Sequence, residues 1–278
     1  MRIGLAAALV LCACHLHLYD PIDEIEYREY PDTGAAIRGI LADTARPRVY
    51  AVGEYHPTRT TVARQSPLAR FTDEIIQLLE PRAQHLVIEA WLDGACRGSA
   101  GETVGKQVAS GIGRPAGTAD QIAQLLEASR RQNLVTHALP MTCIEQGAML
   151  DPRGRVDFLR LLETITDKLR EAARGLVAQG RDVIVYGGAL HNDLYPRYAF
   201  EGLTYARDLA GELDGEVLEL DLVVPEIVAP MAMVRGEPWF PLLGLASPDR
   251  VVVWERGRDS YVVLLPALSE DVGRVARP

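Results

Sequence analysis

Carboxylate and imidazole side chains follow three separate apolar runs of this sequence. Glu54 and His56 stand two positions apart, directly after an apolar run that is broken at Gly53. Glu89 ends the run HLVIE, and His191 follows a later run through the turn YGGALH. A carboxylate near an imidazole can take a proton from water, while a second carboxylate orients the ring. The four acid and imidazole side chains are therefore candidate catalytic residues.

The same side chains also suit a divalent metal ion, which would acidify a bound water molecule. Two imidazoles alone make an incomplete ligand set, so a carboxylate must join them. The predicted metal ligands are Glu54, His56 and His191. The alternative interpretation is structural, in which Glu54 caps the segment that follows it and Glu89 serves a turn.

Strands and helices alternate along the part of the chain that must position these residues. Apolar runs typical of strands lie at 48–53, 85–91, 134–140, 182–188 and 216–224. Amphipathic helical patterns lie between Ser66 and Pro81 and between Arg155 and Gln179. This alternation predicts an α/β fold with a mostly parallel sheet flanked by helices. Ligands of such sheets bind beyond the carboxyl ends of the strands, which is where the candidate residues lie.

The chain is long enough for one sizeable domain, with 278 residues of which 48% are hydrophobic. Residues 48–278 are predicted to form a single α/β domain, with a helical insert at about 95–175. Near its end, the runs VVVWE and SYVVLLP flank a short polar turn and predict a C-terminal antiparallel hairpin. Residues 14–47 show no clean period and are predicted to be an anchor and an irregular lead-in.

The N-terminus has the pattern of an export signal. Arg2 precedes a short apolar run, too short to span a bilayer, and residues 1–13 are predicted to be a signal peptide. The segment Leu11-Cys12-Ala13-Cys14 resembles a bacterial lipobox, which implies lipidation of Cys14. The protein would then lie in the bacterial cell envelope, with its domain on the periplasmic side of a membrane. An ordinary secretory signal is the alternative, and it also exports the protein.

Export affects the interpretation of the two remaining cysteines. An oxidising compartment permits a disulfide between Cys96 and Cys143. These cysteines lack the paired spacing of a zinc site with thiolate ligands, so such a site is not expected.

The charge balance argues against nucleic acid as a partner. The net charge is −9, the isoelectric point is about 5.2, and no cluster of Lys and Arg stands out. Aromatic residues make up 6% of the chain, too few for a surface that stacks on the bases of a single strand. The expected partners are a small molecule or a peptide, together with the membrane that holds the anchor.

Three of these motifs, taken in order, resemble a known superfamily. Gly53-Glu54-Tyr55-His56, an acid at the end of the next strand and a late Gly-rich turn leading into His191 resemble the ChaN-like, TIKI/TraB and erythromycin-esterase superfamily. The short Gly-Glu-x-His spacing is most similar to the ChaN-like branch, which contains haem-binding envelope lipoproteins. The resemblance covers roughly residues 48–225 and implies an α/β core with helical additions.

The resemblance implies two functions. The wider superfamily includes metal-dependent peptidases and an esterase. It therefore implies hydrolysis of an ester or amide, with or without a divalent metal. Glu54 would then act as the general base or bind the metal. Glu89 would orient an imidazole or bind the metal, and the two histidines would bind the metal or stabilise the transition state. The ChaN-like branch implies instead a non-catalytic lipoprotein that binds haem for iron uptake. The candidate haem-ligating tyrosines are Tyr195, Tyr198 and Tyr205, each of which is equally explained as structural. A third interpretation is an envelope scaffold whose ancestral site has decayed.

Overall fold

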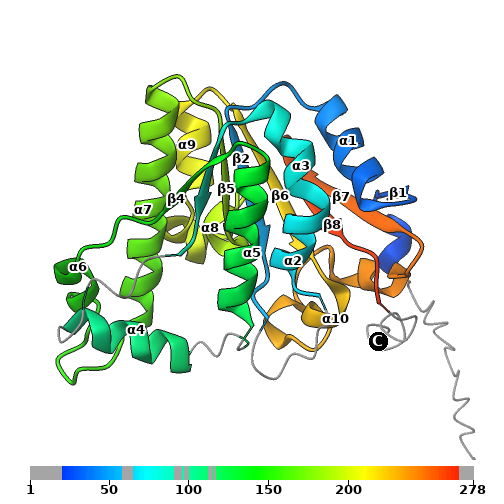
Figure 1. Cartoon of the computed structure of the whole chain (residues 1–278). Helices are drawn as coiled ribbons and strands as arrows, with labels where there is room; N and C mark the ends of the chain where they lie inside the picture. Colours follow the sequence, from blue (N-terminus) through cyan, green and yellow to red (C-terminus); the bar gives the residue numbers. More distant parts are fainter. Residues whose placement is uncertain are drawn as a thin grey trace, which may run out of the picture.

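The computed structural model describes residues 21–57, 65–90, 96, 100–111, 115 and 117–268. Its strands form one eight-stranded sheet in the order β1-β7-β8-β6-β2-β5-β3-β4 (Figure 1). The strands are β1 (Arg28–Tyr30), β2 (Val49–Glu54), β3 (His85–Ile88), β4 (Val135–Ala138), β5 (Val183–Gly188), β6 (Val217–Val223), β7 (Val251–Gly257) and β8 (Ser260–Leu264). Strands β4, β3, β5, β2, β6 and β8 run parallel to one another. Strand β7 pairs antiparallel with β8 and with β1.

Helices cover both faces of this sheet (Figure 1). They are α1 (Thr33–Asp43), α2 (Pro67–Arg70), α3 (Ile76–Leu79), α4 (Ala100–Gly111), α5 (Thr118–Arg131), α6 (Cys143–Gly147), α7 (Phe158–Ala178), α8 (Ala189–Asn192), α9 (Ala206–Glu212) and α10 (Pro225–Val228). Helices α1, α2, α3 and α5 pack on one face, and α7 and α9 pack on the other. The predicted α/β fold, with its mostly parallel sheet and C-terminal antiparallel hairpin, is confirmed.

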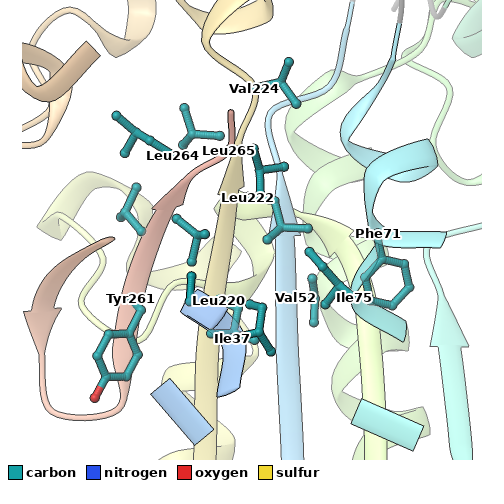
Figure 2. Packing of buried hydrophobic residues seen from close by; sticks show 14 of the residues in the cluster. Ile37, Val52, Phe71, Ile75, Leu220, Leu222, Val224, Tyr261, Leu264 and Leu265 are labelled. Carbon is teal, nitrogen blue, oxygen red and sulfur yellow. The ribbon is translucent and has the colours of Figure 1, made fainter. Parts of the chain in front are cut away.

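The central strands are mostly apolar on both faces, because helices cover both. Every residue of β2, β5 and β6 is buried. Alternate residues of β2 face opposite layers, with Tyr50 and Val52 in one cluster and Val49 and Ala51 in the other. Figure 2 shows the first of these clusters, where side chains of α1 and of the α2–α3 segment meet those of β2, β6 and β8. This packing fixes where each central strand ends, and so fixes the edge that carries the candidate residues.

The prediction of an irregular lead-in is wrong for residues 28–43. Strand β1 pairs with the outer edge of β7, and α1 packs into the core. Helix α1 begins because the Asp32 carboxylate accepts a hydrogen bond of 2.7 Å from the backbone N–H of Ala35. Four apolar residues on one face of α1 are then buried: Ala36, Ile37, Ile40 and Leu41. This spacing is helical, but it follows directly on a run of mixed acidic and aromatic residues without a clear period.

The helical insert expected at about 95–175 is more closely integrated than predicted. It contains α4, α5 and α6, but it also supplies β4, which pairs in parallel with β3. Helix α7, the last element of the insert, buries residues such as Leu161, Leu169 and Ala173 against one face of the sheet. Most of this segment is therefore part of the α/β layers.

Two predictions about the N-terminus cannot be followed in the fold. The signal peptide, residues 1–13, and the lipidation site Cys14 lie outside the described residues. Within the described ranges, no helix has the length and hydropathy that crossing a bilayer requires.

Cys96 and Cys143, the pair proposed from the sequence, form a disulfide with Cα atoms 5.3 Å apart. The bond joins the segment after β3 to the first turn of α6, across a sequence separation of 47 residues.

We expect the Cys143→Ser change to lower the free energy of unfolding by about 4 kcal/mol. The disulfide closes a loop of this length in the unfolded chain, and the entropy that the unfolded chain loses corresponds to about that free energy. Urea denaturation of the variant and of the wild-type protein measures the difference. Dithiothreitol should bring the wild-type protein to the stability of the variant and leave the variant unchanged. A wild-type midpoint that dithiothreitol does not move would contradict the expectation.

Candidate functional site

Three parallel neighbours, β3, β5 and β2, bring the candidate residues to one edge of the sheet. Glu54 is the last residue of β2, and Glu89 directly follows β3. His191 lies in α8, a single turn that begins at the end of β5 without an intervening loop. Because the three strands are adjacent and parallel, their carboxyl ends meet, and the side chains after them converge.

Glu54 and His56 form a hydrogen-bonded acid–imidazole pair. His56 Nδ1 lies 2.5 Å from Glu54 Oε1, and the hydroxyl of Tyr186 donates to Glu54 Oε2. The Glu54 side chain is 2% exposed, so its carboxylate depends on these donors for the hydrogen bonds that water would otherwise supply. Since a carboxylate can only accept, Nδ1 of His56 carries a proton, and in the neutral form of the ring the lone pair is on Nε2.

Glu89 lies on the other side of the same imidazole. Its Oε1 is 3.7 Å from His56 Nε2, and its Oε2 accepts a hydrogen bond of 2.6 Å from the backbone N–H of Gly188. The backbone hydrogen bond fixes the carboxylate at the end of β5. The His56 ring is therefore flanked by two carboxylates, an arrangement that would stabilise positive charge on the ring during a reaction.

Two glycines at the end of β5 make room for this arrangement. A Cβ atom on Gly188 would lie 3.0 Å from His56 Nε2 and 3.6 Å from His191 Cδ2. A Cβ atom on Gly187 would lie 2.8 Å from Glu89 Oε2. The Gly-rich turn that precedes His191 is therefore required by close packing of the site against the backbone.

His191 is a buried, neutral imidazole. Its Nδ1 lies 3.1 Å from the carbonyl oxygen of Leu203 and 2.8 Å from the hydroxyl of Thr166. The carbonyl can only accept, so Nδ1 carries the proton and Nε2 holds the lone pair. Burial lowers the pKa of His191, against the opposite effects of the Glu89 charge and of the hydrogen bond to Leu203. The ring is thus held as a hydrogen-bond acceptor at neutral pH.

The predicted metal ligands do not form a coordination set. In the described part of the chain, no group of three or more His, Cys, Asp or Glu side chains is placed to hold a metal ion. Both oxygens of Glu54 already accept hydrogen bonds, one of them from His56. The geometry of Glu54, His56 and His191 therefore fits an acid–base site better than a metal centre.

A recess lies against the acid–imidazole pair. Its polar side is formed by Glu54, His56, Glu89 and Tyr186, and its apolar side by Leu68, Ile88, Ala90, Ile122 and Leu125. The space that a water molecule can enter in this recess is about 20 Å³. A recess of this size can hold a single water molecule beside the acid–imidazole pair.

The three candidate haem-ligating tyrosines lie in different surroundings. Tyr205 has no exposed surface, and the hydroxyl of Tyr195 donates to the carbonyl oxygen of Arg258 over 3.0 Å. Tyr198 is 90% exposed. None of the three lines the recess.

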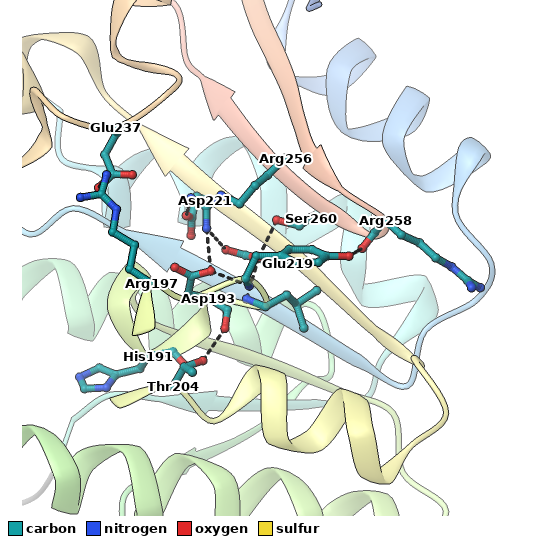
Figure 3. Close-up of polar contacts among 12 residues, drawn as sticks. His191, Asp193, Arg197, Thr204, Glu219, Asp221, Glu237, Arg256, Arg258 and Ser260 are labelled. Carbon is teal, nitrogen blue, oxygen red and sulfur yellow. Dashed lines mark hydrogen bonds and ion pairs between the residues drawn. The ribbon is translucent and has the colours of Figure 1, made fainter. Parts of the chain in front are cut away.

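A buried charged cluster beside the site is absent from the sequence predictions (Figure 3). Arg256 on β7 lies 2.7 Å from Asp193, 3.4 Å from Glu219 and 3.5 Å from Asp221. Figure 3 shows these groups together, with the His191 ring lying apart from them. One Oδ atom of Asp221 packs so closely against Gly53 that a Cβ atom there would lie 2.2 Å from it. The signal in the sequence is the alternation Glu-Leu-Asp-Leu in a run that is otherwise apolar.

The cluster holds more acid groups than a single guanidinium can neutralise. Burial raises the pKa of Glu219 to about 7, even though Arg256 opposes the shift. Burial and the charge of Glu219 raise the pKa of Asp221 well above its usual range. Glu219 also accepts hydrogen bonds from Ser260 at 2.6 Å and from the N–H of Leu194 at 3.0 Å. The pair of acids therefore retains a proton near neutral pH.

The sequence matches no protein-family model and no curated protein. Among solved structures, the chain is similar to one described as the structure of the type III effector HopBA1. The two chains are 15% identical, the match covers 87% of this chain and 97% of that chain, and the TM-score is 0.43. So distant a likeness carries no inference about function. The resemblance to the ChaN-like, TIKI/TraB and erythromycin-esterase superfamily therefore stays a prediction from the motifs.

The buried acids predict how stability depends on pH. The ordinary pKa of a glutamate is 4.5, and that of Glu219 is about 7 in the folded protein. Between these two pKa values the folded protein holds a proton on Glu219 that the unfolded chain releases. The stability that Glu219 contributes is therefore complete below about pH 4.5 and is lost as the pH rises through about 7. Asp221 adds a loss of the same sign with rising pH, because its pKa is also raised.

Chemical denaturation at a series of pH values measures this trend. The Glu219→Gln variant should show a flatter dependence between pH 4.5 and 7, the range between the two pKa values of Glu219. Glu216→Gln is the matched control, because Glu216 immediately precedes the same strand and is exposed. Equal slopes for all three proteins would contradict the assignment.

Proposed function

We propose that this protein hydrolyses an ester or an amide in a small molecule or a peptide, with His56 as the general base. The observation that carries the proposal is the Glu54–His56 pair at the recess, with Nδ1 of His56 held on a buried carboxylate. The ring nitrogen that can take a proton, Nε2, then lies on the side of Glu89. This pairing of a buried acid with an imidazole is the arrangement that activates a nucleophile in many hydrolases.

The reaction follows from the ring's two nitrogens. Nε2 of His56 takes a proton from a water molecule, whose oxygen forms a bond to the substrate carbonyl carbon. The tetrahedral intermediate then breaks its bond to the alcohol or amine, which leaves with the proton from the imidazolium. The products are a carboxylic acid and an alcohol or amine, and the ring returns to its neutral state. Glu54 orients the ring throughout and stabilises its transient charge, as Tyr186 in turn orients Glu54.

We assign supporting roles to the other candidate residues. Glu89, fixed by the N–H of Gly188, adds a second negative charge beside the imidazolium that forms in the reaction. His191 is held neutral, with Nδ1 on Leu203 and Thr166, and its Nε2 can accept a hydrogen bond from a water molecule or from a substrate N–H. This assignment makes Glu54 the orienting acid and moves the role of general base to His56.

We also propose that the protein is exported to the bacterial cell envelope and anchored by lipid at Cys14. The lipobox-like segment supports the anchor. The disulfide between Cys96 and Cys143 supports an oxidising compartment, where such bonds persist.

Substitution of the acid–imidazole pair tests the proposed reaction. We expect His56→Ala and Glu54→Gln to lower kcat/KM for p-nitrophenyl butyrate by about 100-fold or more, the range found for loss of a general base. His85→Ala is the control, because His85 lies at the start of β3 and bonds to His137 at 2.9 Å, away from the site.

Two results would overturn the proposal. One is hydrolysis that persists unchanged in His56→Ala while the protein stays folded by circular dichroism. The other is stoichiometric haem binding, seen as a new absorption band on titration with haemin, in a protein that hydrolyses none of the esters or peptide amides offered. That second result would favour the haem-binding function that the ChaN-like resemblance implies.

A Cys14→Ser variant tests the anchor. Expressed with its native N-terminus in a bacterial host, it should leave the membrane fraction and appear among soluble envelope proteins. One acyl chain holds a protein only weakly, so stable membrane association of the wild type would reflect more than one chain. Equal membrane association of the variant and the wild type would contradict lipidation at Cys14.

A further inference from the structure

We infer that the buried cluster around Arg256 is a positioning device for His191, which acts through the two residues that follow α8. The side chains of the cluster do not line the recess beside the acid–imidazole pair, and they are Asp193, Glu219, Asp221 and Arg256. The inference rests on the proposed hydrolysis, because it gives the cluster a role at the same site. The state of the His191 ring can nevertheless be measured without any hydrolysis.

Helix α8 cannot fix His191 without support from the rest of the fold. It is a single turn, and its N-cap residue, Gly188, has no side chain that could cap it. A single helical turn is unfavourable by itself, because ordering its residues costs more entropy than one hydrogen bond offsets. The start of the turn is held by β5, which runs directly into it. The position of His191 therefore depends on what holds the residues after the turn.

Two strands of the sheet hold those residues through the cluster (Figure 3). The backbone N–H of Leu194 donates to Glu219 Oε2, on β6, over 3.0 Å. Nη1 of Arg256, on β7, donates to Asp193 Oδ1 over 2.7 Å. Two consecutive residues are thus bound to two different strands. These contacts restrain both the position and the direction of the chain as it leaves α8.

The groups that make these contacts are themselves fixed. Glu219 has no exposed surface and accepts a hydrogen bond of 2.6 Å from the hydroxyl of Ser260 on β8. The Arg256 side chain is 14% exposed and also lies 3.4 Å from Glu219 and 3.5 Å from Asp221. Hydrogen bonds to a charged guanidinium are strong, and little water reaches this cluster to compete with them. The cluster is therefore a firm support for the chain that follows α8.

The segment 203–205 passes this restraint on to the ring of His191. The hydroxyl of Thr204 donates to the carbonyl oxygen of Asp193, and the N–H of Tyr205 donates to the carbonyl oxygen of His191 over 2.9 Å. The carbonyl oxygen of Leu203 accepts from Nδ1 of His191 over 3.1 Å. Three consecutive residues thus tie the ring to the chain that the cluster holds. Release of that chain should displace the acceptor that fixes the tautomer of His191.

Proton exchange on the His191 ring tests the inference. Spectra of protein labelled with ¹⁵N-histidine follow the ring N–H groups, and His191→Asn assigns the signal. We expect the Nδ1 proton of His191 to exchange with water about tenfold faster or more in Asp193→Ala and in Arg256→Gln, because its acceptor is displaced. The signals of His56 should not change. Asp193→Asn keeps an oxygen that can accept from Arg256 and should keep the slow exchange.

Turnover of p-nitrophenyl butyrate is the second measurement. Asp193→Ala and Arg256→Gln should lower kcat by about tenfold or more and change KM less, because misplacement of an active-site group by about 1 Å can cost about 100-fold. The two substitutions remove opposite sides of one contact, so the double variant should be no slower than the slower single variant. A cluster that contributes only to stability would leave kcat of the folded variants unchanged.

Glu29→Ala is the matched control. It also removes a carboxylate that binds an arginine of the C-terminal part, because Glu29 lies 2.9 Å from Arg250, the residue before β7. Glu29 is on β1, at the edge of the sheet beyond β7 and away from α8. This variant should change neither the exchange on His191 nor kcat.

The two measurements separate failure of the inference from failure of the proposed function. If His56-dependent hydrolysis is present, but Asp193→Ala and Arg256→Gln are folded by circular dichroism and keep the wild-type exchange and kcat, the cluster does not position His191. The inference then fails while the proposed function stands. If no substrate is hydrolysed, faster exchange in these two variants and not in Glu29→Ala would retain the positioning device and reject the hydrolase.

Discussion

Close approach of side chains to the backbone at Gly53 and Gly188 is the constraint on which the site depends. At Gly188 a Cβ atom would press on His56 Nε2, and at Gly53 it would collide with the Asp221 carboxylate. In the register of β2 and β5, Gly53 is paired with Gly187 and Glu54 with Gly188. The backbone N–H of Gly188 also donates to Glu89. Helix α8 can therefore begin directly on the sheet and place His191 beside the Glu54–His56 pair.

Buried charge in and after the central strands is costly for stability. Glu54, Glu219 and Asp221 are 3% exposed or less, and each lies where an apolar residue would pack without loss of hydration. Tyr186 and His56 satisfy Glu54, and Arg256, Ser260 and the Leu194 N–H satisfy much of the second cluster. Buried acids with raised pKa values, such as Glu219 and Asp221 within β6, are common at functional sites.

The sequence predicts the layers of this fold well, because buried parallel strands are near-continuous apolar runs. The convergence of Glu54, His56, Glu89 and His191 also follows from strand order. What a pattern cannot show is which partner each group selects. In the sequence, Tyr186 is one residue of an apolar run, and only the pairing of β5 with β2 places its hydroxyl beside Glu54. The metal interpretation is weakened by the hydrogen bond between Glu54 and His56, which the sequence does not show. Helix α1 is not predicted from the sequence, because residues without a clear period precede its N-cap Asp32.

The tautomer of His56 tests the central claim most directly. Two-bond ¹H–¹⁵N correlation spectra of protein labelled with ¹⁵N-histidine distinguish the two ring nitrogens, and the His56→Gln variant assigns the signals. At a pH where the ring is neutral, the account predicts a protonated Nδ1 and an unprotonated Nε2, with the pattern altered in Glu54→Gln. A neutral His56 protonated on Nε2, or a spectrum that Glu54→Gln leaves unchanged, would contradict the proposed acid–imidazole pair.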